Sequence, residues 1–338
     1  MFNGSRFTGF AKALMIACAL LGSAAQQALA ETPSVTTVTY GGSSWVGHFP
    51  VWVGIEKGFF KTRGLDVKWE PFGTSSSRMS AMVSGSLDFA GTGVIPALSL
   101  MSAGSRSFSI LATPDSFATV QGVIAKPETK SLAELKGKKI GVTFASSGHL
   151  LILDLLKQNG LDTNKDVMLL NMPVAEMPAA LKSGQIDAAV AWTPAFNVLL
   201  AQPGNHLLAD DTSFSLYRQF KVGTGPDVLI VSRSYAKDHP EQTKAFVDAY
   251  LESVSYLKTH PQEAADILVS LTKLDKEQQL KAVTEVEWHD LAAQQGFMIT
   301  SQAFQDGLGQ LAQFMVDNKQ LGKAPQVSEW FNTDFVKP

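Results

Sequence analysis

The chain has 338 residues, of which 45% are hydrophobic and 17% charged, and its formal net charge is −3 at pH 7. This balance lacks the basic excess that nucleic-acid binding requires, so a nucleic-acid partner is excluded. The single cysteine, Cys18, rules out an internal disulfide, and a chain of this length and apolar content can bury a large core, usually in two domains.

The first thirty residues have the pattern of a cleavable export signal. Arg6 and Lys12 precede an apolar run at 13–21, and small residues lead to the end of the segment at 28–30. The run is far shorter than the roughly twenty residues that span a bilayer. We expect cleavage after residue 30 and a periplasmic protein, with lipid attachment at Cys18 as the alternative.

Cleavage there removes two basic residues and the cysteine. It leaves 26 basic against 31 acidic residues, a net charge of −5. Thiol nucleophiles and thiolate metal sites are thereby excluded, because both need the sulfur itself. The six histidines show no metal-ligand spacing either, so we expect neither a metal nor a cofactor.

From residue 36 onward, short β-rich runs alternate with helical patterns, which predicts parallel sheets covered by helices and therefore the α/β class. Ser131 and Glu134 form a capping-box pattern that predicts a short helix before a strand. Glycines at three positions stand where helices are expected to end. The expected strands are 36–40, 65–70, 87–91, 138–144, 166–171, 186–192 and 227–232, and the glycines are Gly137, Gly160 and Gly184.

Two segments of the chain echo each other at an offset of about 99 residues. Residues 79–90 and 177–189 each read as a helix, a Ser-Gly stop, and a strand that opens with an apolar residue and Asp. Two lobes built on one plan would produce this echo, although a common helix-glycine-strand idiom could also produce it by coincidence. From 236 to 319 the pattern is nearly all helical, and we expect these helices to cover the first lobe.

Four further motifs occur in a fixed order along the chain, and together they resemble the taurine, sulfonate and nitrate-type solute-binding proteins of ABC transporters, a group that includes binders of thiamine precursors. The motifs are EKGFF at 56–60 with GLDV at 64–67, GSLDFA at 85–90, LKGKKIGV at 135–142 and WTPA at 192–195. Residues 192–200 and 225–228 are most similar to taurine binders, whereas the 42–48 loop departs from their pattern.

The resemblance implies a type II periplasmic-binding fold, with two α/β lobes joined by two crossover strands and a ligand held in the cleft without catalysis. Strand-like passages at 119–125 and 227–232 bracket the second set of α/β units. We therefore expect a signal peptide at 1–30, one lobe from 31–118 with 228–338, and the other lobe from 119–227.

Loops at the carboxyl ends of the expected strands are the candidate binding elements, because helix N-termini there offer free N–H groups and hydroxyls. No lysine or arginine occurs in these loops, which suits an anion held by dipoles and hydrogen bonds. Helix capping is the competing role for each hydroxyl. The candidates are Ser43, Ser44, Trp45, His48, Thr74, Ser75, Thr92, Gly93, Ser146, Ser147 and His149.

Trp192 and Asp227 complete the candidate site. Trp192 follows a strand, where its ring can wall a cleft and face a cation. Asp227 stands at the second crossover, where a carboxylate can pair with a ligand ammonium, while Ser146 and Ser147 hold the anionic end. Core packing is the alternative role for Trp192, and a turn after Gly225-Pro226 is the alternative for Asp227.

These observations predict a monomeric binding component of an ABC importer, with a membrane permease as its partner and taurine as the best single ligand. Nitrate, an aliphatic sulfonate, a guanidine or urea-like compound and a pyrimidine thiamine precursor remain open. A sensor subunit is a further alternative. An enzyme of the pyrimidine-synthase type is disfavoured, because such enzymes carry a cysteine-rich motif and lack an export signal.

Overall fold

The computed structural model describes Met1, residues 35–116 and residues 119–337, except for the side chain of Phe297. Residues 2–30 of the expected signal peptide lie outside the described residues. Residues from Thr36 onward form one unit, which is described by itself. Among the described residues, no helix has both the length and the apolar character needed to cross a membrane.

The first of two five-stranded sheets has the order β2-β1-β3-β11-β4. In it β1 pairs in parallel with both β2 and β3, and β11 runs antiparallel between β3 and β4. The strands are β1 (Thr36–Gly42), β2 (Leu65–Pro71), β3 (Phe89–Gly93), β4 (Phe108–Ala112) and β11 (Asp227–Ser232).

The second sheet has the order β10-β6-β9-β7-β8. Here β7 pairs in parallel with β8 and β9, and β6 runs antiparallel between β9 and β10. The strands are β6 (Gln121–Ala125), β7 (Lys139–Val142), β8 (Met168–Asn171), β9 (Ala188–Trp192) and β10 (His206–Asp210). All seven expected strands are thus present to within two residues, whereas β4 and β10 were not expected.

The two sheets share one plan, which explains the echo in the sequence. Each places a parallel trio beside one antiparallel strand and an outer strand, and the echoed segments are the helix and strand at the centre of each plan. The repeated aspartate does the same work in both. Asp88 accepts from the backbone N–H of Thr39 at 2.8 Å, and Asp187 accepts from that of Lys139 at 2.9 Å, so each ties its strand to the parallel neighbour.

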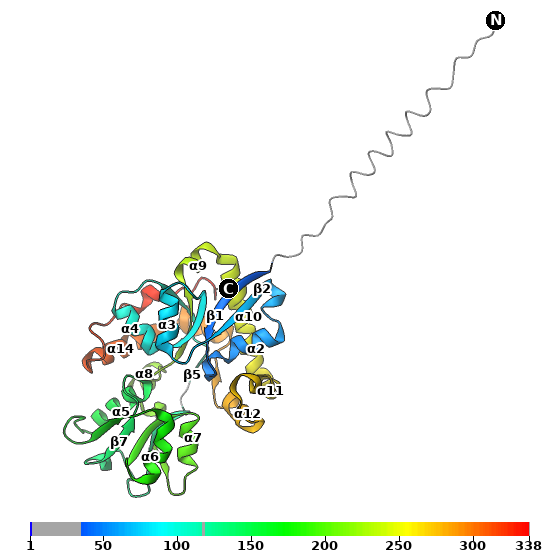
Figure 1. Ribbon diagram of the computed structural model, residues 1–338. Helices are drawn as coiled ribbons and strands as arrows, with labels where there is room; N and C mark the ends of the chain where they lie inside the picture. Colours follow the sequence, from blue (N-terminus) through cyan, green and yellow to red (C-terminus); the bar gives the residue numbers. More distant parts are fainter. Residues whose placement is uncertain (2–34, 117–118, 338) are drawn as a thin grey trace. The chain divides into compact units, whose positions relative to one another are not determined.

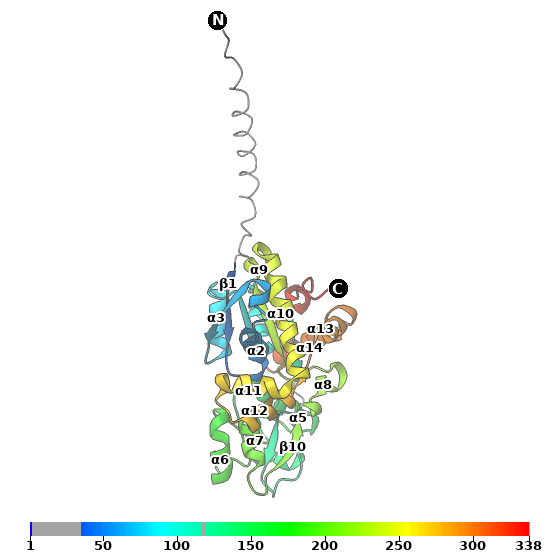
Figure 2. The same cartoon turned by 90° about the vertical axis from the view of Figure 1, so that its right-hand side faces the viewer.

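Helices cover both sheets, and the carboxyl-terminal ones return to the first sheet as expected (Figures 1 and 2). Pro240 and Pro261 each occupy a first helical position, where the missing N–H is harmless. Phe246 is fully buried and stacks on Phe89 of the first sheet, with ring centroids 3.8 Å apart. The helices are α2 (Phe49–Lys57), α3 (Ser75–Val83), α4 (Val94–Ser102), α5 (Ser147–Gln158), α6 (Met177–Ser183), α7 (Ala195–Leu200), α8 (Ser215–Phe220), α9 (Arg233–Asp238), α10 (Pro240–Thr259), α11 (Pro261–Thr272), α12 (Lys276–Thr284), α13 (Leu291–Gln295) and α14 (Ala303–Asp317).

Short turns complete the described chain, and one of them corrects an expectation. The segment that carries Ser131 forms only a 3-10 turn, η3 (Ala133–Leu135), and Glu134 accepts from the N–H of Lys130. The three expected glycines do adopt left-handed conformations, with φ of 78°, 70° and 81°. The other short helices and strands are η1 (Val46–His48), η2 (Lys61–Arg63), η4 (Val174–Glu176), η5 (Asp211–Ser213), the π-helix η6 (Gly296–Thr300), η7 (Val327–Trp330), β5 (Asp115–Ser116) and β12 (Glu287–Trp288).

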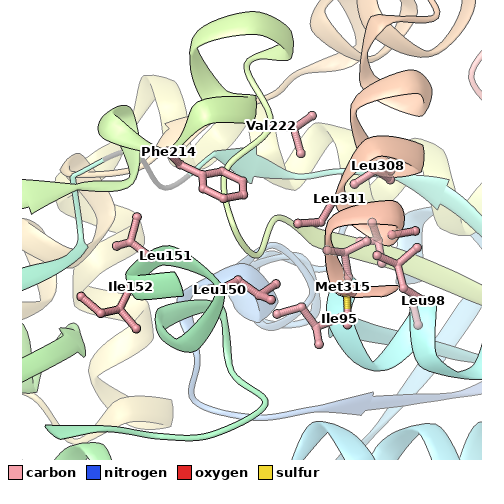
Figure 3. Close-up of a cluster of buried hydrophobic side chains, with 14 of the residues drawn as sticks. Ile95, Leu98, Leu150, Leu151, Ile152, Phe214, Val222, Leu308, Leu311 and Met315 are labelled. Carbon is pink, nitrogen blue, oxygen red and sulfur yellow. The ribbon is translucent and has the colours of Figure 1, made fainter. Parts of the chain in front are cut away.

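Two passages of chain run between the sheets, one from β4 to β6 and one from β10 to β11. Beside them lies a cluster of buried apolar side chains, drawn in Figure 3, to which α4, α5 and α14 all contribute. Phe214 meets Phe314 edge to face within it, with centroids 5.8 Å apart. The two lobes are therefore joined by apolar packing as well as by the chain. The lobe limits at 118 and 227 stay a prediction.

Candidate functional site

A cavity of about 540 Å³ lies where loops of the two lobes face each other. The first lobe contributes the loop after β1, the start of α3 and the start of α4. The second contributes the start of β6, the loop between β7 and α5, and the end of β9. The lining residues are Ser43, Trp45, Phe72, Gly73, Thr74, Ser75, Ser76, Arg78, Gly93, Val94, Ile95, Pro96, Val120, Gln121, Thr143, Phe144, Ala145, Ser146, Ser147, Trp192, Asp211, Gly225 and Asp227.

Most of the expected site residues meet in this cavity. Those that line it are Ser43, Trp45, Thr74, Ser75, Gly93, Ser146, Ser147, Trp192 and Asp227. Four do not. Ser44 and His149 line two neighbouring hollows, and His48 and Thr92 are 1% and 0% exposed. Which of the lining residues contact a ligand stays a prediction.

His48 is buried and holds the loop after β1 in place through a hydrogen bond. Its Nδ1 accepts from the backbone N–H of Ser43 at 2.9 Å, and its ring lies edge-on to Tyr40. Burial, and then the charge of Arg78, hold the pKa of His48 well below its ordinary value, so the imidazole is neutral. His48 therefore shapes the loop and supplies no charge to the cavity.

Arg78 is the residue that the sequence analysis missed, and it corrects the expectation of a site without a basic side chain. It belongs to the first turn of α3 and is only 3% exposed, yet it lines the cavity. Its stem passes over Gly41, where an added Cβ would lie 3.0 Å from Cγ. The described residues give its guanidinium one hydrogen bond, from Nη2 to Oγ of Ser75 at 3.1 Å, and none to Nε.

A signal for Arg78 was present in the sequence. It falls on the same helical face as Met79 and Met82, and all three are buried. An arginine on the apolar face of a helix needs a reason, because long charged side chains are rarely buried without a partner. No acidic oxygen of the described residues lies within ion-pairing distance of Arg78. The guanidinium thus suits an anion in the cavity.

Asp227 opens β11 and is the acidic counterpart. Its Oδ2 accepts from Nε1 of Trp45 at 2.5 Å, and a Cβ at Gly47 would lie only 2.0 Å from the same oxygen. Glycine at 47 therefore lets the loop after β1 close over the carboxylate. Burial raises the pKa of Asp227 to about 6, against the opposing effects of the Trp45 hydrogen bond and the charge of Arg78.

A second buried carboxyl, that of Asp115, lies near the first. Asp115 is 1% exposed, and neither of its oxygens completes a hydrogen bond with a described residue. Burial, and then the charge of Asp227, raise the pKa of Asp115 well above its ordinary value, while the backbone N–H of Asp227 acts in the opposite sense. Of the two carboxyls, Asp227 is the one that loses its proton first, so Asp227, and not Asp115, is the negatively charged member of this pair at neutral pH.

The second lobe adds a hydrogen-bonded chain of polar groups. Ser147 Oγ donates to Oε1 of Gln121 at 2.6 Å, and Nε2 of Gln121 lies 3.0 Å from Oδ1 of Asp211. Thr224, from the passage between β10 and β11, donates to the same carboxylate oxygen at 3.0 Å. Burial raises the pKa of Asp211 to about 7. This series of hydrogen bonds connects the start of β6 and the passage between β10 and β11 to the cavity wall.

Helix starts and aromatic rings form the rest of the wall. Thr74 caps α3 by accepting from the N–H of Ser77, and Ser146 caps α5 by accepting from that of His149. Trp192 is half-buried at the end of β9, and Phe144 is 44% exposed and stacks on His149. The described residues contain no group of acidic, histidine or cysteine side chains that could hold a metal. The arrangement suits a small molecule with one anionic and one cationic end.

Several proteins with similar sequences are named as binding proteins. Over 222 residues the chain is 31% identical to a protein of Brucella abortus named as a binding protein, and this covers 65% of the chain and 66% of the relative. The chain thus spans just under two thirds of that relative's length. It is 24% identical to the taurine-binding periplasmic protein of Escherichia coli over 287 residues, covering 82% of the chain and 86% of the relative.

Solved structures confirm the fold. The crystal structure of the periplasmic aliphatic sulphonate binding protein of Escherichia coli superposes with a TM-score of 0.74 at 19% identity, covering 87% of this chain and 97% of that one. A desulfurization enzyme superposes with a TM-score of 0.63 at 17% identity, covering 89% and 97%. The chain therefore has the expected type II periplasmic-binding fold, which an enzyme shares. Residues 45–264 match the family model described as NMT1/THI5 like, and the chain belongs to that family.

Proposed function

We propose that this protein is the ligand-binding component of an ABC importer and that it binds a small zwitterion, with taurine as the specific ligand. The carrying observation is that a buried guanidinium, Arg78, and a buried carboxylate, Asp227, line one cavity without forming an ion pair with each other. In the bound state Arg78 and the start of α3 hold the sulfonate, and Asp227 holds the ammonium.

The chemistry of the two poles supports a zwitterion over a simple anion. A buried charge is costly unless it is paired, so a ligand that brings both opposite charges compensates both residues at once. Nitrate would leave Asp227 unpaired, and a guanidine or urea-like compound would leave Arg78 unpaired. The names of the relatives agree, since they include a taurine-binding and an aliphatic sulphonate binding protein.

Export and transport follow as parts of the same proposal. The pattern at 1–30 directs the protein to the periplasm, and a membrane permease receives the ligand there. The rival class is an enzyme on this fold, as the desulfurization enzyme illustrates. Binding is favoured over catalysis by a cysteine nucleophile, because the only cysteine of the chain is Cys18, which lies in the expected signal peptide.

Calorimetry with taurine and with ethanesulfonate, which lacks the amine, tests the proposed roles of Arg78 and Asp227. Asp227→Asn should weaken taurine binding about 10- to 150-fold and change ethanesulfonate binding little, since a hydrogen bond to a charged group contributes about 1.5–3 kcal/mol. Arg78→Gln should weaken both ligands, because both carry the sulfonate.

A matched control comes from Arg63, which lies outside the cavity and pairs with Glu252 at 2.7 Å. Arg63→Gln should leave both affinities unchanged. Taurine binding by Asp227→Asn within twofold of the unmodified protein would show that Asp227 does not hold the ammonium. A thermal-shift panel of sulfonates, amino acids, ureas and pyrimidines decides the wider class, since a ligand of the folded state raises the melting temperature. No shift with any sulfonate would contradict the proposed function.

A further inference from the structure

Ser147 has one hydroxyl hydrogen, which it donates in a hydrogen bond to another residue of the protein. Its Oγ lies 2.6 Å from Oε1 of Gln121. On the far side, Nε2 of Gln121 lies 3.0 and 3.2 Å from the two oxygens of Asp211 and 2.8 Å from Oγ1 of Thr224. An ionised carboxylate only accepts hydrogen bonds, so the amide NH₂ has to face Asp211 and the amide oxygen has to face Ser147.

Because its one hydroxyl hydrogen is donated to Gln121, the Ser147 oxygen can only accept a hydrogen bond from a molecule in the cavity. Its position brings this acceptor close to the acidic pole, because a Cβ at Gly225 would lie 2.8 Å from Cβ of Ser147, and Gly225 is two residues before Asp227. Oδ2 of Asp227 is engaged by Trp45, and no hydrogen bond of the described residues engages Oδ1. Two acceptors, one from each lobe, thus line the same part of the cavity.

This arrangement revises the role expected for the two serines at the start of α5. Ser146 donates to the carbonyl of Thr143 at 2.6 Å and accepts from the N–H of His149, so its hydroxyl serves the helix cap. Neither serine has a hydroxyl hydrogen left for an anion. The donors for the anionic end lie in the first lobe, at Arg78 and the first turn of α3.

We propose that Ser147 and Asp227 form a subsite for an ammonium that carries N–H groups, so that the cavity selects primary and secondary ammonium zwitterions over quaternary ones. This inference rests on the proposed function. A trimethylated nitrogen has no hydrogen to donate and would bury both acceptors unpaired. Aromatic rings such as Trp45 and Trp192 attract either kind of cation and give no such preference.

The test compares taurine with N,N,N-trimethyltaurine by calorimetry at pH 8, where Asp211 is ionised because its pKa is about 7. The unmodified protein should bind taurine at least tenfold more tightly. Ser147→Ala should weaken taurine about tenfold and leave trimethyltaurine unchanged, so that the ratio of the two affinities falls. Gln121→Met should lower the same ratio, because it releases the Ser147 hydrogen without removing the hydroxyl.

Ser146→Ala is the matched control, since it removes a hydroxyl from the same helix start. It should lower the melting temperature and change both affinities by the same factor. Equal binding of taurine and trimethyltaurine by the unmodified protein overturns the inference and leaves the proposed function standing. Binding of ethanesulfonate without binding of either zwitterion overturns both.

Discussion

Asp227 has to be ionised to hold an ammonium, and its burial opposes ionisation. Because burial raises its pKa to about 6, the carboxylate that a zwitterion needs is largely absent below that pH and fully present above it. Taurine affinity should therefore rise about tenfold per pH unit on approach to pH 6 and level off by pH 7. Calorimetry between pH 5 and pH 8 measures this, with ethanesulfonate as the pH-independent comparison. A flat taurine profile would contradict the assignment.

The burial that raises the pKa of Asp227 also lowers the stability of the folded protein when this carboxyl is ionised. Its pKa is raised on folding, so the folded chain binds more protons than the unfolded chain between about pH 4 and pH 6, and stability falls as pH rises through that window. A rise of roughly two pKa units corresponds to about 3 kcal/mol.

Asp227→Asn should therefore stabilise the ligand-free protein at pH 8, by up to about 3 kcal/mol, and leave its stability at pH 4 nearly unchanged. Urea unfolding of both proteins at the two pH values measures the difference. An equal effect at both pH values would show that the charge is not its source. A residue that destabilises the fold at working pH and serves the ligand is a trade-off expected of binding sites.

At the scale of elements, α14 packs on the passage between β10 and β11 only because residue 307 is glycine. A Cβ there would lie 2.6 Å from Cγ2 of Val222 and 2.8 Å from Cβ of Phe220. In the same helix, Gly309 has no neighbouring atom within 4 Å of its would-be Cβ. The two glycines thus lie in the same helix but differ in how closely other residues pack against them, so Gly309 is a matched control for Gly307.

Gly307→Ala should destabilise the protein by about 1–2 kcal/mol, since overpacking at this contact exceeds the gain in helix propensity. Gly309→Ala should stabilise it, by up to about 1 kcal/mol, because only the propensity changes. Thermal unfolding of both variants provides the measurement. If both substitutions stabilise the protein, α14 does not pack closely on the passage between the lobes.

At the scale of the whole molecule, the residues proposed to hold the ligand come from both lobes. Arg78 and Asp227 belong with the first sheet and Ser147 with the second, so a ligand that engages all three favours an arrangement in which the lobes approach. The buried apolar cluster beside the two passages, shown in Figure 3, is the natural pivot, because opening it would expose apolar surface.

Taurine should accordingly reduce the radius of gyration measured by small-angle scattering, and it should change tryptophan emission, because Trp45 and Trp192 both line the cavity. Ethanesulfonate, which lacks the group for Asp227 and Ser147, should produce a smaller change. Superimposable scattering profiles with and without bound taurine would rule out closure.

Local patterns in the chain were enough to predict the α/β class, seven strands, the helical carboxyl-terminal part and the repeated helix-strand unit. Each of these depends on periodicity and on glycine or proline chemistry, which a segment carries by itself. The positions of Asp227 and Trp192 beside strands also predicted that both line the cavity, whereas their contacts with a ligand stay a prediction. The strands β4 and β10 escaped notice, because short apolar runs without alternation do not reveal their period.

Only the tertiary structure decided the polarity of the cavity. Thr74 and Ser75 at the start of α3 were expected to line the cavity, but the sequence did not show that the side chain of Arg78 in the same helix lines it as well. The pKa of Asp227 depends on its burial, on the hydrogen bond from Trp45 and on the charge of Arg78. The direction of the Ser147 hydroxyl depends on Gln121 and Asp211. Electrostatic and hydrogen-bonding roles are set by distances between groups, and those distances exist only after the chain has folded.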